Sequence, residues 1–425
     1  MALKKISDEY ELSLTDCIGF SSDGAANVAG KNNSAWSRVK AESPDCIQLK
    51  CTCHSLQLCV QHAFESMPSN IGCMLTDIPN FFSNSSLRRE AYKDLFKVMN
   101  DGETPFTNTF QQFCATRWLG RGKVLYNIVT QWWDLKAYFD MAQAQAPQKE
   151  RYRARELARM LADTSNLLYF HFLTPIITEM EEVNKAFQTS NPDMNELFKL
   201  LDLLYKSLRV RIYDLDGKKK HVLRVDCGVK FDDLGKNMDQ GLVREVRERC
   251  SQFLHQLVEE MEKRLPENKD ILKGLNLFTP EKISSAMFRD LPFQGFCPDV
   301  VKAENEFRKI KLMQLIDLGF DNNEVVKPVR FWAKVAQYEV EGELIFKHIS
   351  TYALNCLSLP VSNAYVERVF SLVCFIKDKF SNRMGLPILD ALLILRTHLQ
   401  AHLFPNVLHF IYNIYFIRGK FVKMF

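Results

Sequence analysis

The sequence lacks a long apolar run and a large excess of charge of either sign. Its longest apolar stretches, such as residues 391–395, fall well short of the about 20 residues that a membrane helix needs. Lys and Arg outnumber Asp and Glu by 55 to 51, so composition alone does not indicate a nucleic-acid-binding surface. The first residues also lack the apolar segment and small-residue cleavage site of a secretory signal. We therefore expect the twelve cysteines to be reduced, in the nucleus or the cytosol.

Paired zinc-binding knuckles and internal repeats are missing as well. Seven of the twelve cysteines lie in the first 114 residues, yet no CxxC pair occurs with a matching distal HxxxH. The thiols and imidazoles between residues 51 and 62 are irregularly spaced: Cys51, Cys53, His54, Cys59 and His62. The apolar residues of this stretch repeat with helical period, which favours buried thiols on a helix over a zinc site.

A short α/β segment followed by long helical patterns is what the sequence does contain. Residues 16–21 and 47–51 predict two buried strands, and each leads into a turn or a helix. From residue 124 onward the apolar spacing is helical for about 200 residues, with a polar turn at 214–221. At 47% hydrophobic residues, the 425-residue chain can bury a large core and predicts two or three structural units.

Four short segments resemble motifs of the hAT family of DNA transposases and of host proteins domesticated from them. They are residues 22–27 (SDGAAN), 51–54 (CTCH), 116–118 (TRW) and 362–371 (SNAYVERVFS). The resemblance implies an α/β, mostly helical fold, in which a large all-α insertion splits an RNase H-like core that is truncated at its N-terminus. It implies an N-terminal part of the core at 1–123, the helical insertion at 124–345, and the rest of the core with the family's dimerisation region at 346–425.

The resemblance also implies a site for two divalent metal ions, Mg²⁺ or Mn²⁺, held by three carboxylates. It assigns the second carboxylate to Asp23 and the third to Glu367, as vestigial metal positions at which binding is weak or lost. The first carboxylate of the family lies several tens of residues before the second, whereas 22 residues precede Asp23 here. Asp8 and Asp16 do not follow an apolar strand. We therefore expect the first metal ligand and the first strand to be missing and the chain to be catalytically inactive.

Two further motifs have both a functional and a structural interpretation. Arg117 and Trp118 can clamp a phosphate and stack on an unpaired base, and the resemblance associates this pair with handling DNA. The alternative is a core tryptophan with an arginine that reaches the surface. Cys51 and His54 lie near the catalytic core in the family pattern, or are a buried thiol and a satisfied core imidazole. Residues 218–221 (KKKH) predict a solvated loop, with a phosphate contact or import signal as the alternative.

The C-terminal part predicts two apolar helical segments. For the first, at residues 363–378, we expect Ser362 as the N-cap and a buried stripe formed by Val366, Val369, Phe370 and Val373. The second segment, which begins near residue 386, is apolar on more than one face, so we expect a partner subunit to bury part of it. The predicted dimerisation residues are Leu386, Leu389, Leu392, Leu393 and Leu395. The aromatic tail at 404–425 departs from the family pattern and has no assignment.

Taken together, these features predict a nuclear, catalytically inactive protein derived from a hAT transposase. It would act as a homodimer, or as a heterodimer with related hAT-derived proteins, with DNA binding or transcriptional regulation as its role. One alternative is an active two-metal transposase or nuclease that an upstream carboxylate completes. The other is a host regulatory scaffold, such as a SUMO-ligase-like protein. We expect no membrane partner, no cofactor apart from Mg²⁺ or Mn²⁺ if the chain is catalytic, and the nucleus rather than the cytoplasm.

Overall fold

The computed structural model describes most of the chain: residues 12–101, 120–145, 148–189, 193–321 and 324–377, and the short stretches 384–385, 387–389 and 391–395. The described residues are mostly helical, as predicted. The predicted strands correspond to β1 (Gly19–Ser22) and β2 (Ile47–Lys50), which form a parallel pair. A separate antiparallel pair consists of β3 (Glu339–Val340) and β4 (Glu343–Leu344). The RNase H-like core stays a prediction, because both sheets of the described residues have two strands.

The chain divides into two compact units. The first comprises residues 1–55, 185–202 and 265–425, and the second comprises residues 56–184 and 203–264. The predicted boundaries at residues 123 and 345 stay a prediction. No helix in the described part of the chain is long and apolar enough to span a membrane.

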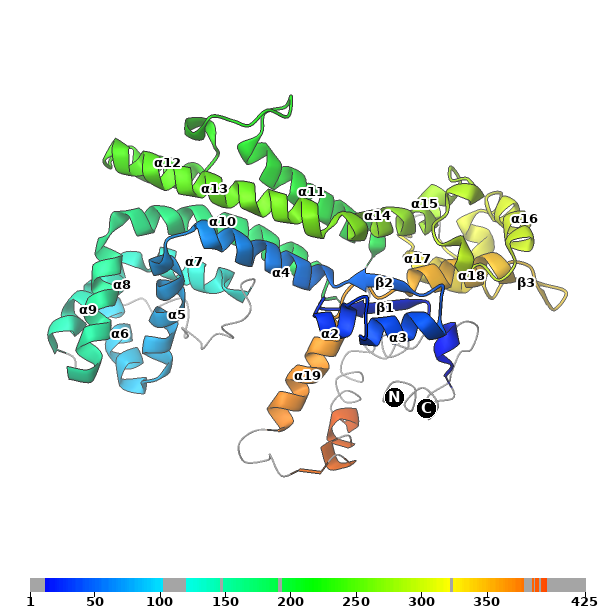
Figure 1. Ribbon diagram of the computed structural model, residues 1–425, viewed down its shortest axis with the longest axis horizontal. Coiled ribbons are helices and arrows are strands. Elements are labelled where there is room, and N and C mark those ends of the chain that lie inside the picture. The colour runs from blue at the N-terminus through cyan, green and yellow to red at the C-terminus, as the bar shows by residue number, and fades with distance from the viewer. Residues whose placement is uncertain are drawn as a thin grey trace. The chain divides into compact units, whose positions relative to one another are not determined.

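The parallel strands lie at the centre of the first unit (Figure 1). Gly19 pairs with Ile47 and Ser22 with Lys50, so the two strands end at the same edge. Position 19 favours glycine, because a Cβ atom would lie 2.8 Å from Cδ2 of Leu359 and 2.9 Å from Cδ of Pro360. The short helices beside the pair are η1 (Leu14–Asp16), α2 (Ala26–Ala29) and α3 (Ala35–Glu42). Helix α3 begins at a capping box, in which the side chains of Ser34 and Ser37 each accept the other residue's amide.

The rest of the first unit is helical. Its elements are α14 (Pro266–Leu275), η5 (Asn276–Phe278), α15 (Pro280–Ile283), η6 (Phe288–Asp290), η7 (Gln294–Phe296), α16 (Val300–Ile310), η8 (Leu315–Leu318), α17 (Pro328–Val335), α18 (Lys347–Leu357) and α19 (Ala364–Ile376). Trp332 is fully buried on α17, and its indole Nε1 donates to the carbonyl of Phe278 at 2.8 Å. A carboxylate oxygen of Glu306 accepts the amides of His348 and Ile349, both at 2.8 Å, which caps the N-terminus of α18.

The second unit consists of helices and short 3-10 turns. Its elements are α4 (Thr52–Ala63), η2 (Phe64–Ser66), α5 (Ser69–Ser83), α6 (Ser86–Met99), α7 (Gly122–Thr130), α8 (Trp132–Gln145), α9 (Gln148–Ala162), α10 (Thr164–Ala186), α11 (Met194–Ile212), η4 (Val222–Arg224), α12 (Val229–Gly235) and α13 (Gln240–Arg264), of which α4, α10 and α11 continue across the unit boundaries. Its core contains the aromatic residues Phe81, Phe82, Tyr92, Tyr138 and Phe139.

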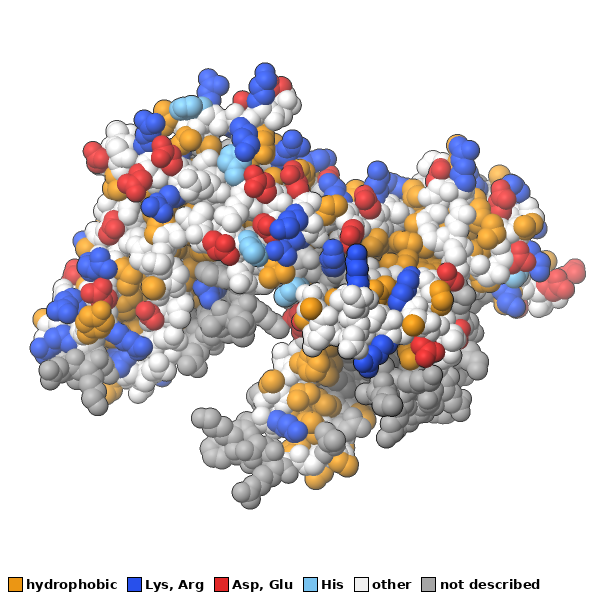
Figure 2. Space-filling model, in the orientation of Figure 1, with side chains coloured by type: hydrophobic (Ala, Val, Ile, Leu, Met, Phe, Trp, Pro, Cys, Tyr) orange, Lys and Arg blue, Asp and Glu red, His pale blue; other side chains and the backbone are white. Residues whose placement is uncertain are grey.

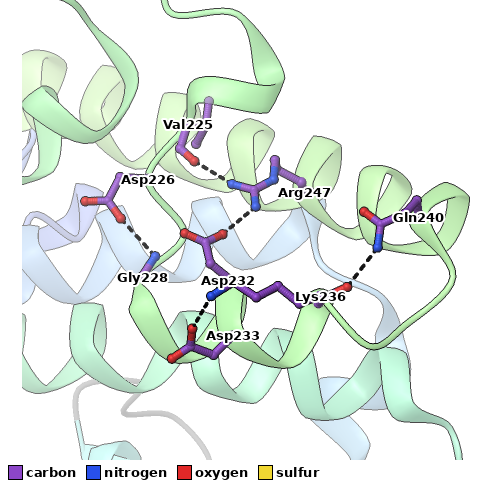
Figure 3. Close-up of polar contacts among 9 residues, drawn as sticks. Val225, Asp226, Gly228, Asp232, Asp233, Lys236, Gln240 and Arg247 are labelled. Carbon is purple, nitrogen blue, oxygen red and sulfur yellow. Dashed lines mark hydrogen bonds and ion pairs between the residues drawn. The ribbon is translucent and has the colours of Figure 1, made fainter.

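One arginine joins α12, α13 and the turn before them (Figure 3). The guanidinium of Arg247 donates to the carbonyl of Val225 at 2.8 Å and pairs with the carboxylate of Asp232. It also lies 5.0 Å from the centroid of the Phe231 ring. Only 12% of the Arg247 side chain is exposed, so this pair is partly desolvated and contributes more than a surface ion pair.

Candidate functional site

The candidate site lies where β1 and β2 end. The amide of Cys51 donates to the carbonyl of Ser22 at 3.1 Å, which continues the parallel ladder by one residue. Asp23 follows β1 directly and Cys51 follows β2 directly, so both residues stand at the same edge of the sheet. The C-terminal edge of parallel strands is where open α/β sheets bind their ligands.

Asp23 forms a turn at this edge. Its side chain is exposed, and its Oδ1 accepts the amide of Ala25 at 3.1 Å. Gly24 between them has a φ of 86°, a conformation that favours glycine. The Asp23 carboxylate therefore acts as a local Asx-turn acceptor.

Two thiols connect the end of β2 with the start of α19. The amide of Asn363 donates to Sγ of Cys51 at 3.4 Å, and Sγ of Cys53 lies 3.5 Å from the hydroxyl of Ser362. The predicted N-cap at Ser362 is wrong, because α19 (Ala364–Ile376) begins one residue later than that prediction requires. Asn363 occupies the N-cap position, without a side-chain cap, and its carbonyl accepts the amide of Glu367 at 3.0 Å.

Sequence reasoning missed a buried asparagine that stabilises this edge. Nδ2 of Asn268, on α14, donates to the carbonyl of Lys50 at 2.6 Å and to Oγ1 of Thr52 at 2.9 Å. The Thr52 hydroxyl in turn donates to the carbonyl of Val361 at 3.3 Å. Asn268 is 4% exposed, so these bonds are shielded from water. A lone asparagine after a helix-starting proline carries no sequence signal for contacts with residues more than 200 positions away.

Glu367 lies on the first turns of α19 and acts on both thiols. The pKa of the Cys51 thiol is lowered to about 7, mainly by the hydrogen bond from Cys53, with smaller contributions from the amides of Asn363 and His54, and burial opposes this shift. The pKa of Cys53 is raised, first by that same hydrogen bond and then by burial. Glu367 lies one helical turn after Asn363, whose amide contacts Cys51, and its negative charge makes a small contribution that raises the pKa of both thiols.

The structure thus brings Cys51, Glu367 and the end of β1 to one edge of the sheet. His54 is half-buried on α4, next to the thiol pair in the sequence. Arg117, Trp118 and Leu386 lie outside the described residues. Among the residues that are described, no group of three or more His, Cys, Asp or Glu side chains is placed to hold a metal ion.

The apolar stripe of α19 is the second feature of interest. The prediction that this stripe is buried is wrong for two of its residues, because Val366 is 40% exposed and Phe370 is 63% exposed. Val369 and Val373 are half-buried. Hydrophobic side chains gather on the surface where α19 lies in Figure 1, as Figure 2 shows. Helical spacing indicates which residues share a face, but not whether the same chain covers that face.

The short described stretches after α19 also expose large apolar side chains. Ile388 is 59% exposed, Ile394 60% and Leu395 56%. Of the other predicted dimerisation residues, Leu389 is buried at 7% exposure, and Leu392 and Leu393 are half-buried. Exposed large apolar side chains in such number are typical of an interaction site.

One family comparison bears on this region. Residues 312–399 match the hAT family C-terminal dimerisation region. The match contains α17, α18, α19 and the exposed apolar residues after α19. It supports an origin of the chain in the hAT family and self-association of this segment.

Proposed function

We propose that this hAT transposase-related protein functions as a catalytically inactive dimerisation module. The main support for the proposal is the exposed apolar stripe of α19, which lies inside the segment that matches the family's dimerisation region. Val366 and Phe370 are one helical turn apart and form a continuous apolar strip on the surface. The same face on a second copy is self-complementary, as a two-fold interface requires.

The first test is the molar mass of the full chain in solution. The subunit mass is 49.3 kDa, so light scattering should give twice this value at micromolar concentration. Leu395→Asp, at a site 56% exposed, should return the mass to one subunit, because a symmetric interface would then bury two facing charges. A parent chain that stays at one subunit over the whole concentration range would contradict the proposal.

The proposed lack of catalysis is supported by the side chains around the two expected metal positions. The carboxylate of Asp23 accepts the amide of Ala25, and the charge of Glu367 acts on the thiols of Cys51 and Cys53. Mg²⁺ prefers hard oxygen ligands and is poorly matched to thiols. Within the part of the chain that the structure describes, these residues therefore fit a two-magnesium site poorly.

A metal titration tests this part of the proposal. The parent and the variants Asp23→Ala and Glu367→Ala should give the same Mn²⁺ binding isotherm by calorimetry. A millimolar or tighter site that is lost in both variants would overturn the assignment and favour the active transposase.

We also propose that the protein acts in the nucleus. There it would form heterodimers with related hAT-derived proteins and take part in transcriptional regulation. Immunofluorescence of the tagged full chain tests the location. Co-purification of two differently tagged hAT-derived chains tests the heterodimer, and the Leu395→Asp variant should be lost from that complex.

A second candidate function is contact with nucleic-acid phosphates. The segment 206–224 has seven Lys and Arg against two Asp, a surplus larger than that of the whole chain, and most of these basic side chains are exposed. They are Lys206, Arg209, Arg211, Lys218, Lys219, Lys220 and Arg224. A local cationic surface can bind the phosphate backbone although the net charge of the chain is small.

Salt-dependent binding to a DNA duplex tests this candidate. Replacing Lys218 and Lys219 by Gln should weaken binding and lower the slope of log affinity against log salt by about 2, because each phosphate contact contributes about 0.9. The matched control replaces Lys302 and Lys309, which are exposed on α16, with the same loss of charge. If the two double variants weakened DNA binding equally, the 206–224 segment would not be a specific contact surface.

A further inference from the structure

The opposite edge of the β1–β2 pair holds another pair of thiols. Cys17 lies two residues before β1 and Cys46 lies one residue before β2. Their Sγ atoms are 3.7 Å apart, within hydrogen-bond distance of each other. The amide of Ile47 donates to the carbonyl of Ile18 at 3.0 Å, so the two backbones run side by side here. Neighbouring strands are about 5 Å apart, which lies within the Cα separation that a disulfide spans.

The backbone around the two thiols is held by further contacts. The hydroxyl of Ser43, which is 3% exposed, lies 2.7 Å from the carbonyl of Cys17, and the amide of Cys46 donates to the carbonyl of Ser43 at 3.1 Å. Nζ of Lys40 donates to the carbonyl of Cys46 at 2.9 Å. These bonds hold the backbone on both sides of the two thiols.

Accessibility distinguishes Cys17 and Cys46 from the other thiol pair of this unit. Cys17 is half-buried, and Cys46 is 1% exposed. Cys51 and Cys53 are both buried, at 2% and 7% exposure, so a dissolved oxidant reaches neither of them easily. A sensing dithiol needs one accessible thiol that reacts first and one close thiol that resolves the product. Cys17 and Cys46 meet both requirements.

The hydrogen bond between the thiols also prepares Cys17 for reaction. It lowers the pKa of the Cys17 thiol to about 7, so a large fraction of Cys17 is thiolate at neutral pH. The pKa of Cys46 is raised, first by the same bond and then by burial, so this thiol keeps its proton. The thiolate is the nucleophile toward peroxides, which assigns the first step to Cys17.

We propose that Cys17 and Cys46 form a peroxide-sensitive dithiol that closes reversibly to a disulfide across the two strands. The Cys17 thiolate attacks hydrogen peroxide, the O–O bond breaks, and the released hydroxide takes a proton and leaves as water. Sγ of Cys46 then attacks the sulfenic acid on Cys17, the S–O bond breaks, and the second hydroxide leaves as water with the proton of Cys46. The two thiols lose two electrons and two protons, and one peroxide becomes two waters. This modification site is independent of self-association and of the residues near Glu367.

The test treats the fully reduced chain with substoichiometric to slight molar excesses of hydrogen peroxide, blocks the remaining thiols with N-ethylmaleimide and maps the peptides by mass spectrometry. We expect the cross-linked peptide of Cys17 and Cys46 to appear before any change at Cys51 or Cys53, and dithiothreitol to remove it. Oxidation of Cys73, an exposed thiol on α5, at a dose that leaves Cys17 and Cys46 unmodified would overturn the proposal.

Two variants separate the roles of the thiols. Cys46→Ser should stop at a sulfenic acid on Cys17, which dimedone traps, and Cys17→Ser should leave Cys46 reduced at the same dose. A parent chain in which Cys17 becomes sulfenic acid without forming the cross-link would refute the role of Cys46. Circular dichroism confirms that both variants are folded, and the peptide map of the parent chain decides the question even if a variant is not.

Discussion

Replacing Phe370 by Ala should weaken self-association strongly without affecting the fold of the subunit. A phenylalanine has roughly 200 Å² of surface, so the 63% of Phe370 that is exposed corresponds to roughly 130 Å². The change removes roughly 100 Å² of apolar area, which at about 25 cal/mol/Å² is about 2.5 kcal/mol per copy. A symmetric dimer contains two copies, so the dissociation constant should rise more than about a thousandfold, and about 60-fold if the dimer buries half of this area.

Sedimentation equilibrium over a wide concentration series measures this change. The matched control is Tyr152→Ala on α9, because Tyr152 is also an aromatic residue on a helix, is also 63% exposed, and lies outside residues 312–399. The control should keep the dissociation constant of the parent. At a concentration at which all three chains are monomeric, both variants should keep the melting temperature of the parent, because exposed side chains contribute little to the fold of the subunit. A Phe370→Ala chain that dimerises as tightly as the parent would refute the assignment of the α19 stripe to the interface.

Three further predictions concern the fold and the thiols. Arg247→Ala should lower the free energy of unfolding, measured in urea, by about 2 kcal/mol, because a partly buried charged donor is lost. The control Arg244→Ala removes an exposed ion pair with Glu248, one helical turn away, and should lower the free energy of unfolding by less than about 0.5 kcal/mol. Equal costs would contradict the partial desolvation of Arg247. Asn268→Ala should cost about 2 to 3 kcal/mol by the same measurement, because two acceptors lose their donor, and a loss below about 0.5 kcal/mol would mean that water replaces it. The alkylation rate of Cys17 by iodoacetamide should rise with pH to half its maximum near pH 7, since the thiolate reacts, and Cys46→Ala should move this midpoint to higher pH by removing the bond that stabilises the thiolate. An unchanged midpoint would show that the lowered pKa has another cause.

Both strands of the parallel pair could be predicted because each is a short segment with several apolar residues that leads into a turn or a helix. Residues 47–51 match β2 to within one residue, and residues 16–21 overlap β1, which begins at Gly19. The turn after β1 was predictable too, since aspartate followed by glycine favours this backbone geometry. These features depend on neighbours in the sequence, and local chemistry is sufficient to specify them.

The contacts at the candidate site could not be predicted in the same way. The bonds from Asn268 to Lys50 and Thr52 join residues more than 200 positions apart, and the contacts of the Ser362–Asn363 turn with the two thiols join residues more than 300 positions apart. Asparagine, serine and cysteine are common in turns and helices, so their types carry no information about such distant partners. Their roles follow only from the packing of α14 and α19 against the end of β2.

Sequence periodicity by itself determined that Val366 and Phe370 share one face of a helix, because spacing along the chain sets their angle around the helix axis. Whether this face is buried was decided by tertiary structure, which leaves Phe370 63% exposed. The same holds for Cys17 and Cys46, whose 29-residue separation says nothing about contact until the parallel register places their sulfur atoms 3.7 Å apart. Local periodicity specifies the direction in which a side chain points, whereas burial and proximity depend on which distant segments pack beside it.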